Sequence, residues 1–219
     1  MESRFSHLAI IRWFTEALFP AYCVRCTAEG SVFCSSCKSV WWPTPIVISA
    51  KGPVETLFAV CPYKDRVMQS LIGQWKYQGV TAAKDELFGI VERAVRDYGD
   101  ALPHVDAVAF VPLHARKRNQ RGFDQAELLA THLAELLRVP VLPAIERTRF
   151  TEQQAQVDRA DRHKTELISA FALRQGIVVP KRLLLVDDVW TTGNTMQAAA
   201  FVLRAARAEH VHAFTLAKG

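Results

Sequence analysis

The sequence predicts an α/β protein in which a mostly parallel sheet is flanked by helices, with a small cysteine-rich module in front. Two observations predict the sheet. Strand-like and helix-like segments alternate from residue 105 onward, a pattern typical of parallel strands joined by helical crossovers. Residues 183–186 are consecutive aliphatic residues, as expected for a strand buried on both faces. The module is indicated by a group of cysteines between residues 23 and 37.

The composition fits one globular protein without a membrane span. The chain has 219 residues, of which 50% are hydrophobic and 22% are charged, and this balance excludes a disordered chain. No apolar run approaches the ~20 residues that cross a bilayer. Arg12 and Glu16 interrupt the apolar stretch near the N-terminus, so it lacks the continuous core of a secretory signal. We therefore expect a cytoplasmic protein.

Apolar periodicity and helix-ending residues give the elements in order. Residues 5–19 carry an apolar stripe at helical spacing, and the proline-rich link at 41–45 suggests a boundary. We divide the chain there into residues 1–45, an N-terminal helix and the cysteine module, and residues 46–219, the sheet domain. Further helices are expected over residues 65–78, 82–98, 124–136, 159–167 and 195–208, strands over residues 56–62, 105–111, 139–145, 183–186 and 210–216, and a long polar loop over residues 147–158.

Four of the five cysteines form two CxxC pairs, Cys23 with Cys26 and Cys34 with Cys37. Each CxxC folds into a tight turn that aims two sulfurs at one point, so two pairs assemble a tetrahedral thiolate site. Zinc is the expected metal, and an iron–sulfur cluster is the alternative. Four thiolates fill the coordination sphere, so the zinc would be structural. Cys61 lies in an apolar run and is expected to be a core thiol.

The strongest chemical signal follows the aliphatic strand at 183–186. Two acids come first, and a turn rich in threonine and glycine then opens a helix. The acids are Asp187 and Asp188, and the turn comprises Thr191, Thr192, Gly193, Asn194 and Thr195. Backbone N–H groups at a helix N-terminus bind phosphate, and carboxylates accept hydrogen bonds from sugar hydroxyls. The pattern is neither a Walker loop nor a GxGxxG loop. The alternative is an ordinary capped helix with the acids as turn residues, and we expect both acids to be solvated before any ligand arrives.

A basic segment follows the strand predicted at 105–111. Residues 114–121 carry four positive charges and no acid, in a chain whose formal net charge is +5. The candidate ligand-binding residues of this segment are His114, Arg116, Lys117 and Arg121. A solvated loop is the ordinary interpretation, and a site for a phosphate-rich ligand is the functional one.

Together these motifs resemble a known family. The segment 183–195 is similar to the phosphoribosyl diphosphate signature of the type I phosphoribosyltransferases. The cysteine module and the motifs KYQG (76–79), VPLH (111–114), RGFDQA (121–126) and RTRFTEQQ (147–154) occur in the order seen in the ComF family of competence-associated phosphoribosyltransferase-like proteins. The resemblance covers residues 20–217. Two positions depart from the family pattern, which has asparagine where this chain has Asp124 and Thr165.

The resemblance implies a type I phosphoribosyltransferase-like fold and assigns the motifs to one ligand. Asp187 and Asp188 would hold the ribose hydroxyls as the catalytic acids, residues 191–195 would bind the 5′-phosphate, and residues 112–121 would bind the diphosphate. Magnesium would be shared between diphosphate and ribose oxygens. The resemblance also implies a lid and a hood, with candidate residues Thr151, Gln153, Arg159 and Arg162 for the lid, and Lys76 and Tyr77 for the hood over the acceptor. The alternatives are a solvated excursion for the lid and an amphipathic helix surface for the hood.

Two functions from different classes follow. One is transfer of phosphoribose to an unknown nitrogenous acceptor, with displacement of diphosphate at the anomeric carbon. The other is non-catalytic binding of phosphoribosyl diphosphate or single-stranded DNA in DNA uptake, with DNA-uptake proteins as partners. A zinc-ribbon nucleic-acid protein is a third interpretation, based on the basic balance and on Trp41 and Trp42 as exposed aromatics. It leaves the acids and the glycine turn without a role.

Overall fold

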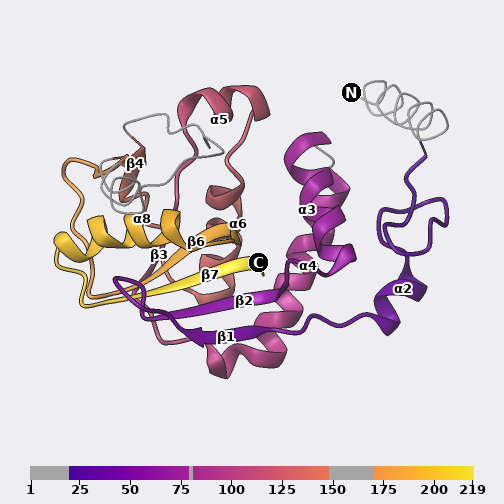
Figure 1. The fold of residues 1–219 in the computed structure, drawn as a ribbon, viewed down its shortest axis with the longest axis horizontal. Coiled ribbons are helices and arrows are strands. Elements are labelled where there is room, and N and C mark those ends of the chain that lie inside the picture. Colours follow the sequence, from indigo (N-terminus) through magenta and orange to yellow (C-terminus); the bar gives the residue numbers. More distant parts are fainter. Residues whose placement is uncertain (1–19, 79–80, 148–169) are drawn as a thin grey trace, which may run out of the picture.

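The computed structural model describes residues 20–78, 81–147 and 170–219, which are organised around a five-stranded sheet (Figure 1). Its strands are β1 (Ile46–Ser49), β2 (Thr56–Pro62), β3 (Ala107–Phe110), β6 (Arg182–Trp190) and β7 (His210–Lys218). The order across the sheet is β1-β2-β7-β6-β3. β1 is antiparallel to β2, and the other neighbours are parallel. The predicted mostly parallel α/β fold is confirmed.

Helical and strand elements cover both faces of this sheet (Figure 1). The helices are α2 (Ser35–Val40), α3 (Arg66–Gln78), α4 (Thr81–Tyr98), η1 (Gly99–Ala101), α5 (Ala115–Arg121), α6 (Gln125–Leu137) and α8 (Asn194–Ala205). α3, α4 and α6 pack on one face. α8 covers the other face together with a two-stranded antiparallel sheet of β4 (Ile145–Arg147) and β5 (Phe171–Leu173). The helices predicted over 5–19 and 159–167 lie outside the described residues.

The aliphatic run in β6 is buried between these two layers. Leu184 and Val186 face the core beneath α3, α4 and α6. Leu183 and Leu185 face the core beneath α8. All four side chains are almost completely shielded from water, which explains why the run has no polar residue on either face.

β6 does not end at residue 186, as the sequence predicted, but continues to Trp190. Its partner is β7, where Asp187 lies opposite Thr215 and Val189 lies opposite Ala217. Pairing with a long neighbouring strand overrides the weak strand preference of aspartate. The acids therefore lie within a strand, not in a turn after one.

The basic segment is a helix, not a loop. α5 begins at an N-cap formed by His114, whose Nδ1 accepts a hydrogen bond from the Arg116 N–H at 3.2 Å. It ends at Gly122, which adopts the left-handed conformation with φ of 77°. The seven-residue helix thus has a capping side chain at its start and a left-handed glycine at its end. These helix-end residues are present in the sequence, but the run of charged residues favoured the prediction of a loop.

The cysteine module packs against the sheet domain. Lys38 forms an ion pair of 2.6 Å with Glu86 of α4. The Trp41 Nε1 donates to Asp65 Oδ2 at 3.0 Å, immediately before α3. Trp41 is buried, so its prediction as an exposed aromatic is wrong, whereas Trp42 is exposed. The module thus shares the core of the domain that follows it.

Candidate functional site

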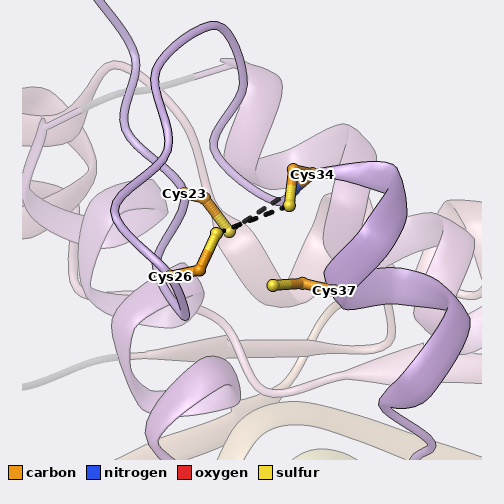
Figure 2. Close-up of side chains that lie close together, drawn as sticks. All are labelled: Cys23, Cys26, Cys34 and Cys37. Carbon is orange, nitrogen blue, oxygen red and sulfur yellow. Dashed lines mark hydrogen bonds between the residues drawn. The ribbon is translucent and has the colours of Figure 1, made fainter.

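The four predicted metal ligands converge on one point (Figure 2). Cys23 and Cys26 come from the loop before α2, Cys34 precedes that helix, and Cys37 lies within it. Their sulfur atoms all lie within 4.8 Å of one another, and the Cys26 and Cys34 sulfurs are 3.6 Å apart. Zn–S bonds of ~2.3 Å in a tetrahedron place sulfurs about 3.8 Å apart. The geometry therefore fits a single zinc ion.

The electrostatics of the cysteines also fit a cation. Burial opposes ionisation of Cys23, but backbone N–H groups, among them that of Cys34 at 3.5 Å, lower the pKa of Cys23 to about 6. Burial and the neighbouring sulfurs raise the pKa of Cys37 to about 12. Four thiolates in this space repel one another unless a metal ion neutralises them. Cys61 is separate: burial raises its pKa to about 12, as expected for a core thiol.

The second group of predicted residues gathers around the acids of β6. The Lys76 Nζ, in the last turn of α3, lies 2.6 Å from Asp188 Oδ2, and each of these side chains is only 16% exposed. Lys76 was predicted as a hood residue over the acceptor, and this role stays a prediction; the structure pairs its ammonium with one of the acids. Tyr77 follows it in α3.

Asp187 differs from its neighbour in environment. Its Oδ1 accepts a hydrogen bond from the Asp188 N–H at 2.8 Å. Burial, followed by the negative charge of Asp188, raises the pKa of Asp187 to about 8, although Lys76 opposes this shift. Both acids are half-buried, so water reaches them less freely than the sequence suggested.

Positive side chains from three elements act on this region. Lys117 belongs to α5. Partial burial, followed by the positive charges of Arg121, Arg147 and Lys76, lowers the pKa of Lys117, and Asp188 opposes the shift. α3, α5 and β4 therefore bring positive charge to one place. This convergence could not be deduced from spacing along the sequence, because β4 lies far from α3 in the chain.

Arg147 was not among the predicted ligand-binding residues. Its guanidinium lies 5.3 Å from the centre of the Phe171 ring. Burial lowers the pKa of Arg147, and the charge of Asp187 opposes that shift. The signal that could have found it is its place at the start of the RTRFTEQQ motif.

Asp124 connects the segment after β3 to α6. Its carboxyl caps α6 by accepting hydrogen bonds from Ala126 and Glu127 N–H groups, and its Oδ2 accepts a third from the Leu113 N–H at 2.8 Å. Burial raises the pKa of Asp124, and these N–H groups oppose the shift. A carboxylate has two acceptor oxygens for these donors, whereas asparagine has one. The three N–H donors therefore explain why an aspartate fits this position, where the family pattern has asparagine.

The glycine turn joins β6 to α8. Thr191, Thr192 and Asn194 are exposed, and Thr195 is half-buried. Gly193 has a φ of +80°, and a Cβ built on it would lie within 2.5 Å of ring atoms of Trp190. Gly193 itself offers no side-chain cap to α8, and the Asn194 N–H donates to Thr192 Oγ1 at 3.4 Å. N–H groups in the first turn of α8 suit an anion. The sequence did not reveal that the ring of Trp190 leaves no space for a Cβ at position 193.

The remaining predicted residues are placed as follows. His114 and Arg116 form the start of α5, and Arg121 donates to Gln125 Oε1 at 3.0 Å. The lid candidates lie outside the described residues, namely Thr151, Gln153, Arg159 and Arg162. Within the described ranges, no helix has the length and apolar character needed to cross a bilayer.

Comparisons with known proteins agree with the fold and the motifs. The family model described as phosphoribosyl transferase domain matches residues 123–219. The chain is 28% identical to competence protein F of Haemophilus influenzae over 91% of this chain and 85% of that protein. It is 25% identical to competence protein ComFC of Streptococcus pneumoniae, over 90% of this chain and 80% of that protein.

Two solved structures of enzymes also match. Adenine phosphoribosyl transferase from Trypanosoma brucei matches with a TM-score of 0.44 and 14% identity, over 80% of this chain and 74% of that chain. A glutamine phosphoribosylpyrophosphate amidotransferase from B. subtilis matches with a TM-score of 0.43 and 18% identity, and the match spans 62% of this chain and 27% of that one.

A further relative is the DNA utilization protein YhgH of Escherichia coli O157:H7, with 35% identity over 83% of this chain and 82% of that protein. This identity extends along most of both chains. The cysteine cluster and the phosphoribosyl transferase domain agree with it. This chain belongs to the ComF family of competence-associated, phosphoribosyltransferase-like proteins.

Proposed function

We propose that this protein binds phosphoribosyl diphosphate at the end of β6 and transfers its phosphoribosyl group to a nitrogenous acceptor. The observation that carries the proposal is the convergence of cations around Asp187 and Asp188. Partial burial, followed by the positive charges of Arg121 and Arg147, lowers the pKa of Lys117, which supports a concentration of positive side chains beside the acids. A diphosphate complements such a site.

Each part of the ligand has a proposed place. The carboxyls of Asp187 and Asp188 accept hydrogen bonds from the ribose hydroxyls. Residues 191–195 hold the 5′-phosphate at the start of α8. Lys117 and Arg121 hold the diphosphate, together with His114 and Arg116 at the start of α5.

Magnesium would reach this site on the diphosphate. Asp188 is already paired with the Lys76 ammonium, so the two acids do not form an open pair of carboxylates for a free metal ion. A metal held by phosphate and ribose oxygens would neutralise the charge of the ligand. The residues of this chain do the rest: they orient the ribose and hold the leaving group.

The proposed reaction is a substitution at the anomeric carbon. The acceptor nitrogen forms a bond to that carbon, the bond to the diphosphate oxygen breaks, and diphosphate leaves with the electron pair. The cations of α5 stabilise the charge that develops on the leaving group, and the acids fix the ribose in line with the acceptor.

Calorimetric titration with two ligands tests the site. The double variant Asp187→Asn/Asp188→Asn should lose most of its affinity for ribose 5-phosphate and much less of its affinity for inorganic phosphate, because an amide accepts hydrogen bonds less strongly than a carboxylate. Asp106→Asn is the control, since Asp106 pairs with Arg182 at 2.6 Å at the other end of β6. Equal losses for both ligands, or none, contradict the ribose assignment.

A second candidate function is non-catalytic binding of phosphoribosyl diphosphate or single-stranded DNA in cytoplasmic steps of DNA uptake. The names of the relatives, competence protein and DNA utilization protein, favour it. Release of diphosphate with candidate bases or nucleotides supports the enzyme. Tight binding without release, for every acceptor class, supports the second function.

We also propose that Cys23, Cys26, Cys34 and Cys37 bind one structural zinc ion. The closed set of thiolates leaves no position for a substrate. The boundary near residue 45 stays a prediction, and its test is whether residues 46–219 fold when expressed alone.

A further inference from the structure

The contact between Lys76 and Asp188 joins a helix end to the acid pair. Lys76 lies in the last turn of α3, where the helix dipole favours a positive charge. Its ammonium is 2.6 Å from Asp188 Oδ2, and both side chains are 16% exposed. Such shielding distinguishes the pair from ordinary surface ion pairs, which water and salt weaken.

Several negative charges meet at this point. The Asp188 N–H bonds to Asp187 Oδ1 at 2.8 Å, which holds the two side chains in one small region. Asp124 adds a further negative charge that Asp187 senses. Without a cation, adjacent carboxylates in a shielded place must take up a proton or a metal ion.

We propose that Lys76 is the resident counter-ion of Asp188 and that it keeps the acid pair closed to free divalent cations. The ammonium occupies the space beside the carboxylate oxygen, and a divalent ion would have to enter against its charge. A divalent ion therefore reaches this place only when a phosphate ligand carries it. This last consequence rests on the proposed function, whereas the counter-ion role does not.

Manganese binding to the full-length, zinc-loaded protein tests the role without any phosphate ligand. Free Mn²⁺ is measured by electron paramagnetic resonance. Lys76→Met should gain one site that binds Mn²⁺ on the order of tenfold more tightly than the wild type does, because the pair of acids loses its counter-ion. Lys76→Arg should behave as wild type. Lys38→Met is the matched control, because Lys38 also forms a 2.6 Å ion pair, with Glu86.

The added site must depend on the acid. Lys76→Met/Asp188→Asn should bind Mn²⁺ no better than wild type. The proposal is overturned if wild type binds Mn²⁺ as tightly as Lys76→Met, if Lys76→Met gains no site, or if the gain survives Asp188→Asn.

A second measurement does not depend on the folding of Lys76→Met. In Asp188→Asn the amine of Lys76 loses its partner, so its acylation rate, followed by mass spectrometry, should rise several-fold while that of Lys38 stays unchanged. An unchanged rate at Lys76 overturns the proposal. Failure of phosphoribosyl diphosphate binding would leave both measurements intact, so the two proposals fail separately.

Discussion

Replacing Gly193 by alanine should destabilise the protein through one identifiable contact. Gly193 has a φ of +80°, and an added Cβ would lie within 2.5 Å of ring atoms of Trp190. Ordinary van der Waals contact begins near 3.4 Å, so the ring, or the turn, has to move by about 1 Å. Trp190 is 8% exposed and packs in the core beneath α8, where displaced side chains meet others.

The cost has two parts. An L-residue in the left-handed conformation costs roughly 1–2 kcal/mol relative to glycine, and overpacking a core costs a further ~1–3 kcal/mol. The expected loss in the free energy of unfolding is therefore about 2–5 kcal/mol. Domains of this kind have ~5–15 kcal/mol in total, so the effect is large.

Gly176→Ala separates the two parts. Gly176 has a φ of +76°, and a Cβ added to it would meet no neighbouring atom within 4 Å, so this variant measures the conformational cost alone. Urea denaturation followed by circular dichroism, with zinc present, should show Gly193→Ala losing ~1–3 kcal/mol more than Gly176→Ala. Equal losses would refute the role of the Trp190 ring. A third variant checks the cause, since Trp190→Leu should make Gly193→Ala less costly.

Three further predictions concern charge and metal. Purified protein should contain one zinc per chain, lost in Cys23→Ser/Cys26→Ser, and a metal-free but fully folded wild-type module would contradict this. The pKa of Asp187 is raised from 3.8 to about 8, so between these pH values the folded state keeps a proton that the unfolded state has lost. The contribution of Asp187 to stability is complete below about pH 4 and declines as the pH rises to about 8. Asp187→Asn should therefore flatten this decline in the free energy of unfolding measured by urea titration. Lys117→Ala and Arg121→Ala should each weaken phosphoribosyl diphosphate binding by ~1–3 kcal/mol in calorimetry; a loss of DNA affinity alone would favour the nucleic-acid interpretation.

The sequence predicted most of the central fold because its signals are local. The predicted strand at 56–62 matches β2, and the predicted helices at 65–78 and 82–98 match α3 and α4 within a residue. It did not predict β1 or β5, which are short strands whose partners lie elsewhere in the chain. Residues 139–145 form a bridge at Val141 and the start of β4, not a continuous strand.

The candidate site was predictable where a motif is contiguous in the chain. The spacing of the cysteines alone predicts their cluster, and the aliphatic run locates the acids. The pairing of Lys76 with Asp188 was not predictable, because it depends on how the end of α3 packs over β6. For the same reason, the charges of Lys76 and Asp124, which act on the pKa of Asp187, come from elements far away in the sequence.

One helix connects the two candidate centres. Asp65 accepts a hydrogen bond from Trp41, beside the cysteine module, and another from the Met68 N–H in the first turn of α3. Lys76 lies in the last turn of α3, about 16 Å from Asp65 at 1.5 Å per residue. Removal of zinc should therefore weaken the ion pair between Lys76 and Asp188, although neither residue contacts the metal site. Thermodynamic linkage is reciprocal, so a ligand that stabilises the end of α3 should also slow the transfer of zinc to a chelator.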